Sequence, residues 1–399
     1  MTASSPGSYR VVLLTADRQT DADALVVELE AQAKRSGGTR AALEITRDAT
    51  VLDPEPEPDD PTTVLVVVSG SAATGQDPVI GQAVSRCRES MRACLPVFDG
   101  CGSFQEQMPT QVHELNGVLW AQGSRPESIA AHTLRLLGLA EGERRVFLSY
   151  RRSDGSALAH QLRHALLDER WDVFLDRFSV PPAADFQHRL YQDLADKAFV
   201  LLLETPDVTG SDWVEHEVAF AHAHRLGLMS LAMPETAPEQ LYPSVLRQLR
   251  RQLSDAEVEP PAGSRTLTPD ALASVLQEMD ERHAEAYQQR RETLMLETSA
   301  EMRRHHYTVT PIGPWALLGS RGSMDEVVLT TARAPEPSDL HTAEQLRLEV
   351  RARGRTARGW VVHPLEDINE ERARLLGWLS RHRRVKPSPL MVLASRLER

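Results

Sequence analysis

The sequence lacks any apolar run of the roughly eighteen residues that a helix needs to cross a bilayer. Its first residues also lack the basic stretch and apolar core of a signal peptide. We therefore expect a cytoplasmic protein without a membrane-spanning segment. Lysine is scarce as well, occurring only at positions 34, 197 and 386, and this strong preference for arginine is typical of a GC-rich bacterial genome.

Cysteine is also rare. The three cysteines, Cys87, Cys94 and Cys101, are spaced seven residues apart, which matches neither a zinc-ligand pattern nor a disulfide framework. The chain further lacks a glycine-rich dinucleotide fingerprint, a P-loop and a nucleophile elbow. These absences predict free thiols, no bound metal and no redox cofactor.

Negative charge outweighs positive charge, with 45 Lys or Arg against 57 Asp or Glu and a formal net charge of −12. Phosphate binding draws on clustered basic side chains, so this balance argues against a chain devoted to nucleic acid. From Arg351 to the end, however, twelve basic residues stand against five acidic ones, a net charge of +7. A solvated face is the simpler interpretation, and a docking surface for nucleic acid or an acidic partner stays open.

The sequence does contain short Val/Leu-rich runs that alternate with helical patterns, once over 1–140 and again over 144–255. Strands alternating with helices predict an α/β fold with doubly wound parallel sheets. In such sheets ligands bind beyond the carboxyl ends of the strands. A long polar helical pattern over 269–304 opens the third region, 265–399, which we expect to be a smaller α/β or α+β domain of unknown role.

Three blocks of the second region resemble the hallmark blocks of TIR (Toll/interleukin-1 receptor) domains in order and spacing. They are VFLSYRRSDG (146–155), VFLDRFSVPPAADF (173–186) and GSDWVEHEVAFA (210–221). The resemblance covers about 110 residues and implies a flavodoxin-like parallel sheet. TIR domains divide into scaffolds that assemble signalling complexes and enzymes that hydrolyse or cyclise NAD.

Trp213 and Glu217 are four residues apart and therefore share one face of a helix. In NAD-cleaving members this W-V-x-x-E pattern supplies the catalytic glutamate, so the resemblance implies that role for Glu217 and a place beside the substrate for Trp213. Nicotinamide leaves as a neutral ring, and the oxocarbenium-like ribosyl centre is what a fixed carboxylate stabilises. NAD is thus expected as a substrate rather than a cofactor.

Tyr150, Arg151 and Arg152 follow the first predicted strand of this region, at the edge where a ligand should lie. Their Y-R-R step resembles that of NAD-cleaving members and implies contact with NAD. Arginine suits a diphosphate through forked hydrogen bonds, and tyrosine offers a flat face for stacking. The alternative is a solvated basic loop.

Asp176, Arg177 and Phe178 begin the loop after the second predicted strand, which in TIR domains moves and mediates assembly. By resemblance we count all three as substrate-binding. The loop carries two prolines and an alanine at 181–183, where related proteins usually place a glycine. This departure should stiffen the loop and puts its role in gating NAD in doubt.

The first region resembles a diverged copy of the second. TGQDPV at 74–79 matches TGSDWV at 209–214, and VVL at 11–13 matches VFL at 146–148, both at an offset of 135 residues. We infer a diverged TIR-like domain from these matches. Chance similarity between two α/β sheets is the alternative.

At this offset Glu217 pairs with Gln82, which is nearly isosteric but carries no charge. The segment 150–152 pairs with 15–17, where an aspartate would repel a diphosphate. We therefore predict that the first region is a pseudo-enzyme copy, which packs against the active domain or senses a signal for it.

These patterns favour an NAD glycohydrolase or cyclase whose TIR domains assemble into a homo-oligomer when activated. Resemblance to bacterial TIR effectors implies antiviral defence, with an unknown activating partner or ligand bound by the N- or C-terminal domain. Two alternatives stay open. One is a non-catalytic assembly protein, and the other is transfer of ADP-ribose to a macromolecule held by the basic C-terminal region.

Overall fold

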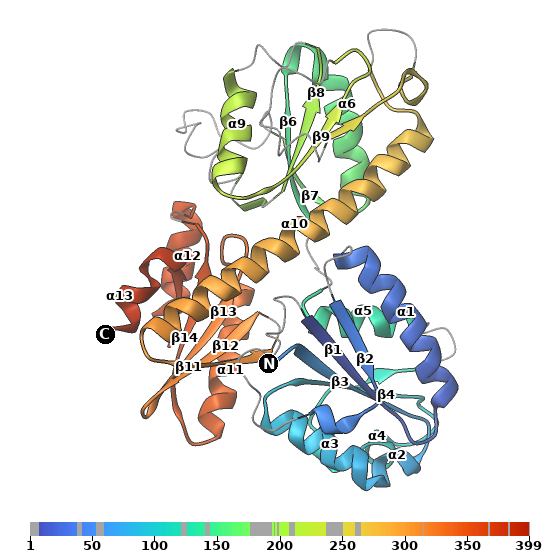
Figure 1. Ribbon diagram of the computed structural model, residues 1–399, viewed down its shortest axis with the longest axis vertical. Helices are drawn as coiled ribbons and strands as arrows, with labels where there is room; N and C mark the ends of the chain where they lie inside the picture. The colour runs from blue at the N-terminus through green and yellow to red at the C-terminus, as the bar shows by residue number, and fades with distance from the viewer. Residues whose placement is uncertain are drawn as a thin grey trace.

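The computed structural model of the protein contains three five-stranded sheets joined by one long helix, α10 (Pro269–Arg304) (Figure 1). It describes residues 8–37, 42–52, 60–120, 126–139, 144–175, 194, 196–197, 199–206, 212–236, 250–259, 265–313, 315–365, 368–381 and 384–398. Within these ranges no helix is long and apolar enough to cross a membrane.

The first sheet is entirely parallel, with the strand order β2-β1-β3-β4-β5. Its strands are β1 (Ser8–Leu14), β2 (Ala42–Thr46), β3 (Thr62–Ser69), β4 (Ala93–Phe98) and β5 (Val118–Leu119). Its helices are α1 (Gln19–Gly37), α2 (Ala72–Gln76), α3 (Pro78–Glu89), α4 (Phe104–Gln107) and α5 (Pro126–Leu136). Apolar side chains of α1 and α5 cover one face of the sheet, and those of α3 cover the other.

The second sheet is also entirely parallel, with the order β10-β9-β8-β6-β7. Its strands are β6 (Arg145–Tyr150), β7 (Asp172–Leu175), β8 (Phe199–Glu204), β9 (Gly227–Ala232) and β10 (Arg250–Gln252). Counted from its own first strand, this is the same order as in the first sheet. Helix α6 (Arg152–Asp168) covers one face, and α9 (Asp212–Ala223) covers the other.

Helix α10 belongs to more than one region of the chain. Its first turns bury Ala271, Val275 and Met279 in the core that α6 forms with the second sheet. The expected boundary between 255 and 265 therefore does not separate this helix from the second sheet. Further along, Gln288 donates a hydrogen bond to the hydroxyl of Tyr9 in the first sheet, so α10 ties the regions together.

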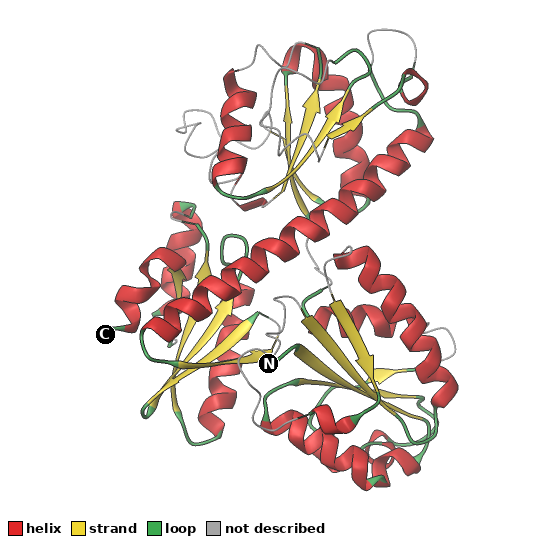
Figure 2. Cartoon of the chain, viewed as in Figure 1, coloured by secondary structure: helices red, strands yellow, loops and turns green. Residues whose placement is uncertain are grey.

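The third sheet and its helices form the C-terminal domain (residues 308–398), which is mixed α/β as expected (Figure 2). Its strand order is β11-β12-β13-β14-β15, antiparallel from β11 to β13 and parallel from β13 to β15. The strands are β11 (Thr308–Gly313), β12 (Ala316–Arg321), β13 (Met324–Thr330), β14 (Thr356–His363) and β15 (Val385–Pro389). The helices are α11 (Pro337–Ala352), α12 (Glu370–Ser380) and α13 (Leu393–Leu397).

The two parallel sheets share their strand register as well as their order. Val12 stands beside Leu65 in the first sheet, and Phe147 stands beside Val200 in the second, each pair shifted by 135 residues. From β4 and β9 onward the shift is 134, because Phe98 pairs with Ser69 where Ala232 pairs with Glu204. The common register supports the interpretation of the first region as a diverged copy.

The helices α3 and α9 also correspond at a shift of 134. The buried positions of α3 are Ile80, Ala83, Val84 and Cys87, and those of α9 are Val214, Glu217, Val218 and Ala221. Ala83, not Gln82, therefore stands at the position of Glu217, and Gln82 is exposed. The pairing expected from the sequence is wrong because the connection before α9 is one residue shorter, and one residue turns a helix by about 100°.

Candidate active site

A buried polar pair lies near the carboxyl end of β6. Side chains alternate along a strand, so Phe147 and Ser149 face α9, whereas Val146 and Leu148 face α6. The Ser149 hydroxyl donates a hydrogen bond to Glu217 Oε2. Ser149 is 1% exposed and Glu217 is 6% exposed, so the bond lies inside the domain.

Glu217 interrupts the apolar stripe by which α9 attaches to the sheet. The other buried positions of that stripe are valine or alanine, and they pack on β6 and β8. Burying a carboxylate costs free energy that a hydrogen bond from a hydroxyl offsets only in part. Departures of this kind from good packing are concentrated at functional sites. The pair also lies at the sheet edge where parallel α/β domains bind ligands.

Tyr150 and Ser149 face opposite sides of the second sheet. Tyr150 ends β6 and faces α6, where its ring packs over Gly155; a Cβ at that glycine would come within 3.3 Å of ring atom Cδ2. The residue against Glu217 is its neighbour Ser149, and the Tyr150 side chain lies on the opposite face of the sheet. The reason is strand alternation, which sends adjacent side chains to opposite faces.

Of the other predicted substrate-binding residues, the structure describes the side chains of Arg151 and Arg152. Arg151 is the N-cap residue of α6 and is half-buried, and Arg152 begins that helix and is exposed; both lie at the carboxyl edge. Trp213 lies in α9 one turn before Glu217, and its side chain is outside the described part of the structure. Asp176, Arg177 and Phe178 lie outside the described residues.

A second buried carboxylate, Glu204, escaped the sequence analysis. It ends β8 on the face that carries Ser149 and is 2% exposed. Arg250 Nε donates to its Oε2 at 2.7 Å, and the Ser230 hydroxyl donates to its Oε1. This ion pair ties β8 to β10 across β9, so it stabilises the sheet beside the candidate site. Polar residues in otherwise apolar strand segments are the signal that would have revealed Ser149 and Glu204.

The start of α6 forms the other wall of the carboxyl edge. Asp154 accepts a hydrogen bond from the Thr205 hydroxyl at 2.8 Å, directly after β8, and Arg265 Nη1 lies 3.4 Å from its other oxygen. Asp154 thus fixes α6 against the end of β8. Among the described residues no group of three or more His, Cys, Asp or Glu is arranged to hold a metal ion.

Comparisons with known proteins complete the description of this region. No curated protein matches the chain. A putative sugar binding protein from Salmonella typhimurium LT2 has 9% identity and a TM-score of 0.21, covering 70% of this chain and 88% of its own. Proximal thread matrix protein 1 from the mussel byssus has 10% identity and a TM-score of 0.22, covering 69% and 96%. These two likenesses are too weak to support any argument. The family model described as "TIR domain" matches residues 146–259, and this part of the chain is a TIR domain.

Proposed function

We propose that the TIR domain cleaves NAD between nicotinamide and ribose, with Glu217 as the essential carboxylate. The observation that supports this most strongly is the burial of Glu217 at the carboxyl edge of β6, held there by Ser149. A carboxylate in a position that otherwise suits an apolar side chain is explained by chemistry that needs its charge.

The reaction breaks the bond between ribose C1′ and the pyridinium nitrogen. The bonding electron pair stays with nicotinamide, which leaves neutral and needs no acid, while positive charge develops on the ribosyl centre. A carboxylate close to that centre stabilises the charge, more strongly so away from bulk water. Water then adds to the sugar to give ADP-ribose and a proton, or a nucleophile of the same molecule closes a ring. The Ser149 hydrogen bond restricts the rotation of the Glu217 carboxylate, so its orientation is set before substrate binds.

The first domain lacks the equivalent groups. By shared register and burial, Leu14 stands where Ser149 does and Ala83 where Glu217 does, and both belong to an apolar cluster. At its carboxyl edge Arg18 forms an ion pair with Asp99, and a Cβ on Gly70 would overlap the Arg18 side chain. These groups support a pseudo-enzyme role for the first domain, with NAD cleavage confined to the second.

The central experiment replaces Glu217 by glutamine, which retains the shape of the side chain and removes its charge. Purified Glu217→Gln should release nicotinamide from NAD at least about 100-fold more slowly than the unchanged protein. Glu235→Gln is the matched control, because Glu235 is an exposed carboxylate that follows β9. It should behave as the unchanged protein does. Nicotinamide release that survives in Glu217→Gln would remove the enzymatic assignment.

Assembly and biological role form the second part of the proposal. TIR domains of several copies associate when a signal reaches the chain, and the resulting loss of NAD serves antiviral defence in a bacterium. Specific activity should therefore rise with protein concentration or with a crowding agent. If the protein is inactive under all these conditions yet forms ordered assemblies, the non-catalytic assembly role replaces this proposal. Labelled NAD that leaves its label on a macromolecule would instead indicate ADP-ribose transfer.

A further inference from the structure

Helix α9 has a second contact surface besides the sheet. Phe220, one turn after Glu217, packs against the cluster of Ala334 and Leu365 in the C-terminal domain, on which Ile368 also packs. Its ring also lies against His224 with the ring centroids 4.1 Å apart. The helix that carries Glu217 is therefore held on its inner side by the sheet and on another side by a different domain.

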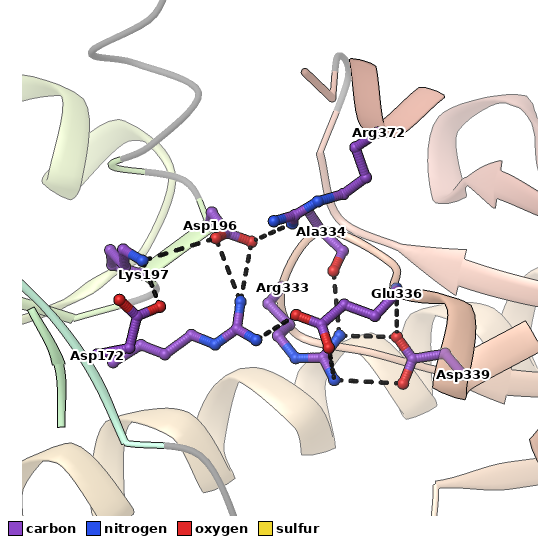
Figure 3. Close-up of polar contacts among 9 residues, drawn as sticks. Asp172, Asp196, Lys197, Arg333, Ala334, Glu336, Asp339 and Arg372 are labelled. Carbon is purple, nitrogen blue, oxygen red and sulfur yellow. Dashed lines mark hydrogen bonds and ion pairs between the residues drawn. The ribbon is translucent and has the colours of Figure 1, made fainter. Parts of the chain in front are cut away.

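An ion network joins the same two domains (Figure 3). The Arg145 guanidinium, at the start of β6, forms ion pairs with Asp196 of the TIR domain and Glu336 of the C-terminal domain. Arg372 of α12 reaches the same Asp196, with its Nη1 2.7 Å from Oδ1. Lys197 extends the network with an ion pair to Asp172 at 2.6 Å. Each domain thus supplies both an acid and a base to one shared network.

The electrostatics favour this docked arrangement. Arg145 and Asp196 are each 7% exposed in the docked arrangement, so their charges lie largely out of water together with the partners that the C-terminal domain supplies. Burial disfavours the charge of Glu336, yet the hydrogen bond from Arg145 and the charge of Arg333 hold its pKa below the ordinary value. A cavity of about 380 Å³ is lined by members of both the apolar contact and the ion network. The two domains therefore leave part of the space between them unfilled.

The comparison with α3 explains why α9 needs this contact. In α3 every position of the inner stripe is apolar, whereas α9 places Glu217 in its own stripe and loses apolar attachment to the sheet. At the position of Phe220, α3 carries Arg86. The C-terminal domain contacts the end of α3, where Arg353 donates to the backbone carbonyls of Arg88 and Glu89 and Met91 packs on the third sheet's core.

We propose that the C-terminal domain is a positioning partner of α9, and that Phe220 is the residue through which it holds Glu217 in place. This inference rests on the proposed NAD cleavage. Phe220 acts through the helix and touches no reacting atom. Its removal lowers the rate of the chemical step because a small displacement of a catalytic carboxylate is enough to weaken transition-state stabilisation.

The test compares Phe220→Ala, Phe220→Leu and Met91→Ala in the full chain. Phe220→Ala should lower kcat for nicotinamide release about 10-fold while KM changes by less than about 3-fold, because the binding groups stay in place. Phe220→Leu retains an apolar contact and should recover most of the rate. Met91→Ala removes a matched contact of the first domain and should leave kcat unchanged.

Hydrogen exchange of the α9 backbone amides supplies a readout independent of activity. Phe220→Ala should speed exchange along α9 and leave α3 as it is, whereas Met91→Ala should not affect α9. Unchanged exchange in α9 together with an unchanged kcat would overturn the proposal. A rise in kcat would overturn it too, because the contact would then restrain the enzyme. If the unchanged protein releases no nicotinamide, the proposed function fails, and the exchange data still decide whether the contact positions α9.

Discussion

The first and second sheets of this chain have the same strand order and register, and they differ at the place where chemistry is expected. The second sheet holds Ser149 against Glu217, and the first holds Leu14 near Ala83 within one apolar cluster. The same architecture therefore packs well with two apolar side chains at this place. The comparison teaches that the polar pair is not a requirement of the fold, and that a functional reason must account for it.

Moving the Ser149–Glu217 pair into the corresponding positions of the first domain should have the largest effect, and this effect is on stability. Leu14→Ser with Ala83→Glu puts the polar pair among the apolar side chains of the first domain, and the free energy of unfolding should fall by about 3 kcal/mol or more. Urea unfolding followed by circular dichroism measures this. Leu14→Ala alone controls for the lost leucine contacts. If the double variant is no less stable than that control, the fold itself accommodates the pair and the comparison loses its functional meaning.

Placing the apolar side chains of the first domain into the second domain should have the next largest effect. Ser149→Leu with Glu217→Ala gives the second domain the side chains of the first, with a similar total volume. NAD cleavage should drop at least about 100-fold, equal to about 2.7 kcal/mol in activation free energy. Meanwhile the free energy of unfolding should stay constant or rise by about 1 kcal/mol. A large loss of stability would show that the pair is structural.

As the pH falls, the second sheet should lose stability at a higher pH than the first sheet. His283 of α10 is buried against the rings of Trp171 and Phe199 behind the second sheet. Burial, with a smaller contribution from Arg144, lowers the pKa of His283 to about 3. His283 therefore stays neutral in the folded protein, and the stability that depends on this neutral imidazole is fully present above pH 6.5. It is lost as the pH falls from 6.5 toward 3, because the unfolded chain binds a proton that the folded chain does not.

At pH 5 this single histidine should lower the free energy of unfolding by about 2 kcal/mol relative to neutral pH. Backbone hydrogen exchange, measured at pH 7 and pH 5 and corrected for intrinsic rates, should show a larger loss of amide protection at pH 5 in β6 and β8 than in β1 and β3. In His283→Phe the loss of amide protection at pH 5 should become more similar in the two sheets. If that variant shows the same difference between the sheets, another group is responsible.

Removing the serine hydroxyl alone should have the smallest effect. Ser149→Ala leaves Glu217 in place but removes one restraint on the orientation of its carboxylate, and kcat should fall about 10-fold, close to 1.4 kcal/mol. Ser149→Thr retains the hydroxyl and should restore most of the rate. Steady-state nicotinamide release measures both variants. An unchanged rate in Ser149→Ala would mean that Glu217 is oriented by its other contacts.

Much of the architecture could be predicted from local patterns. Apolar runs such as TTVLVVVS identify buried parallel strands, because both faces of such strands are covered. The spacing of Trp213 and Glu217 places both on one helix face, since a helix repeats every 3.6 residues. The three TIR-like blocks located the domain that the family model matches at 146–259.

Other features depend on contacts between residues far apart in the chain, which local patterns do not specify. The hydrogen bond from Ser149 to Glu217 joins residues 68 positions apart, and the docking of Phe220 joins two domains. The equivalence of Glu217 and Ala83 depends on one residue in a connecting segment, which the helix geometry amplifies into a change of face. The sequence by itself determined the main strands and helices and pointed to Glu217 as the candidate carboxylate. Only the tertiary structure decided which neighbours hold that carboxylate, because burial and partners are set by how the elements pack.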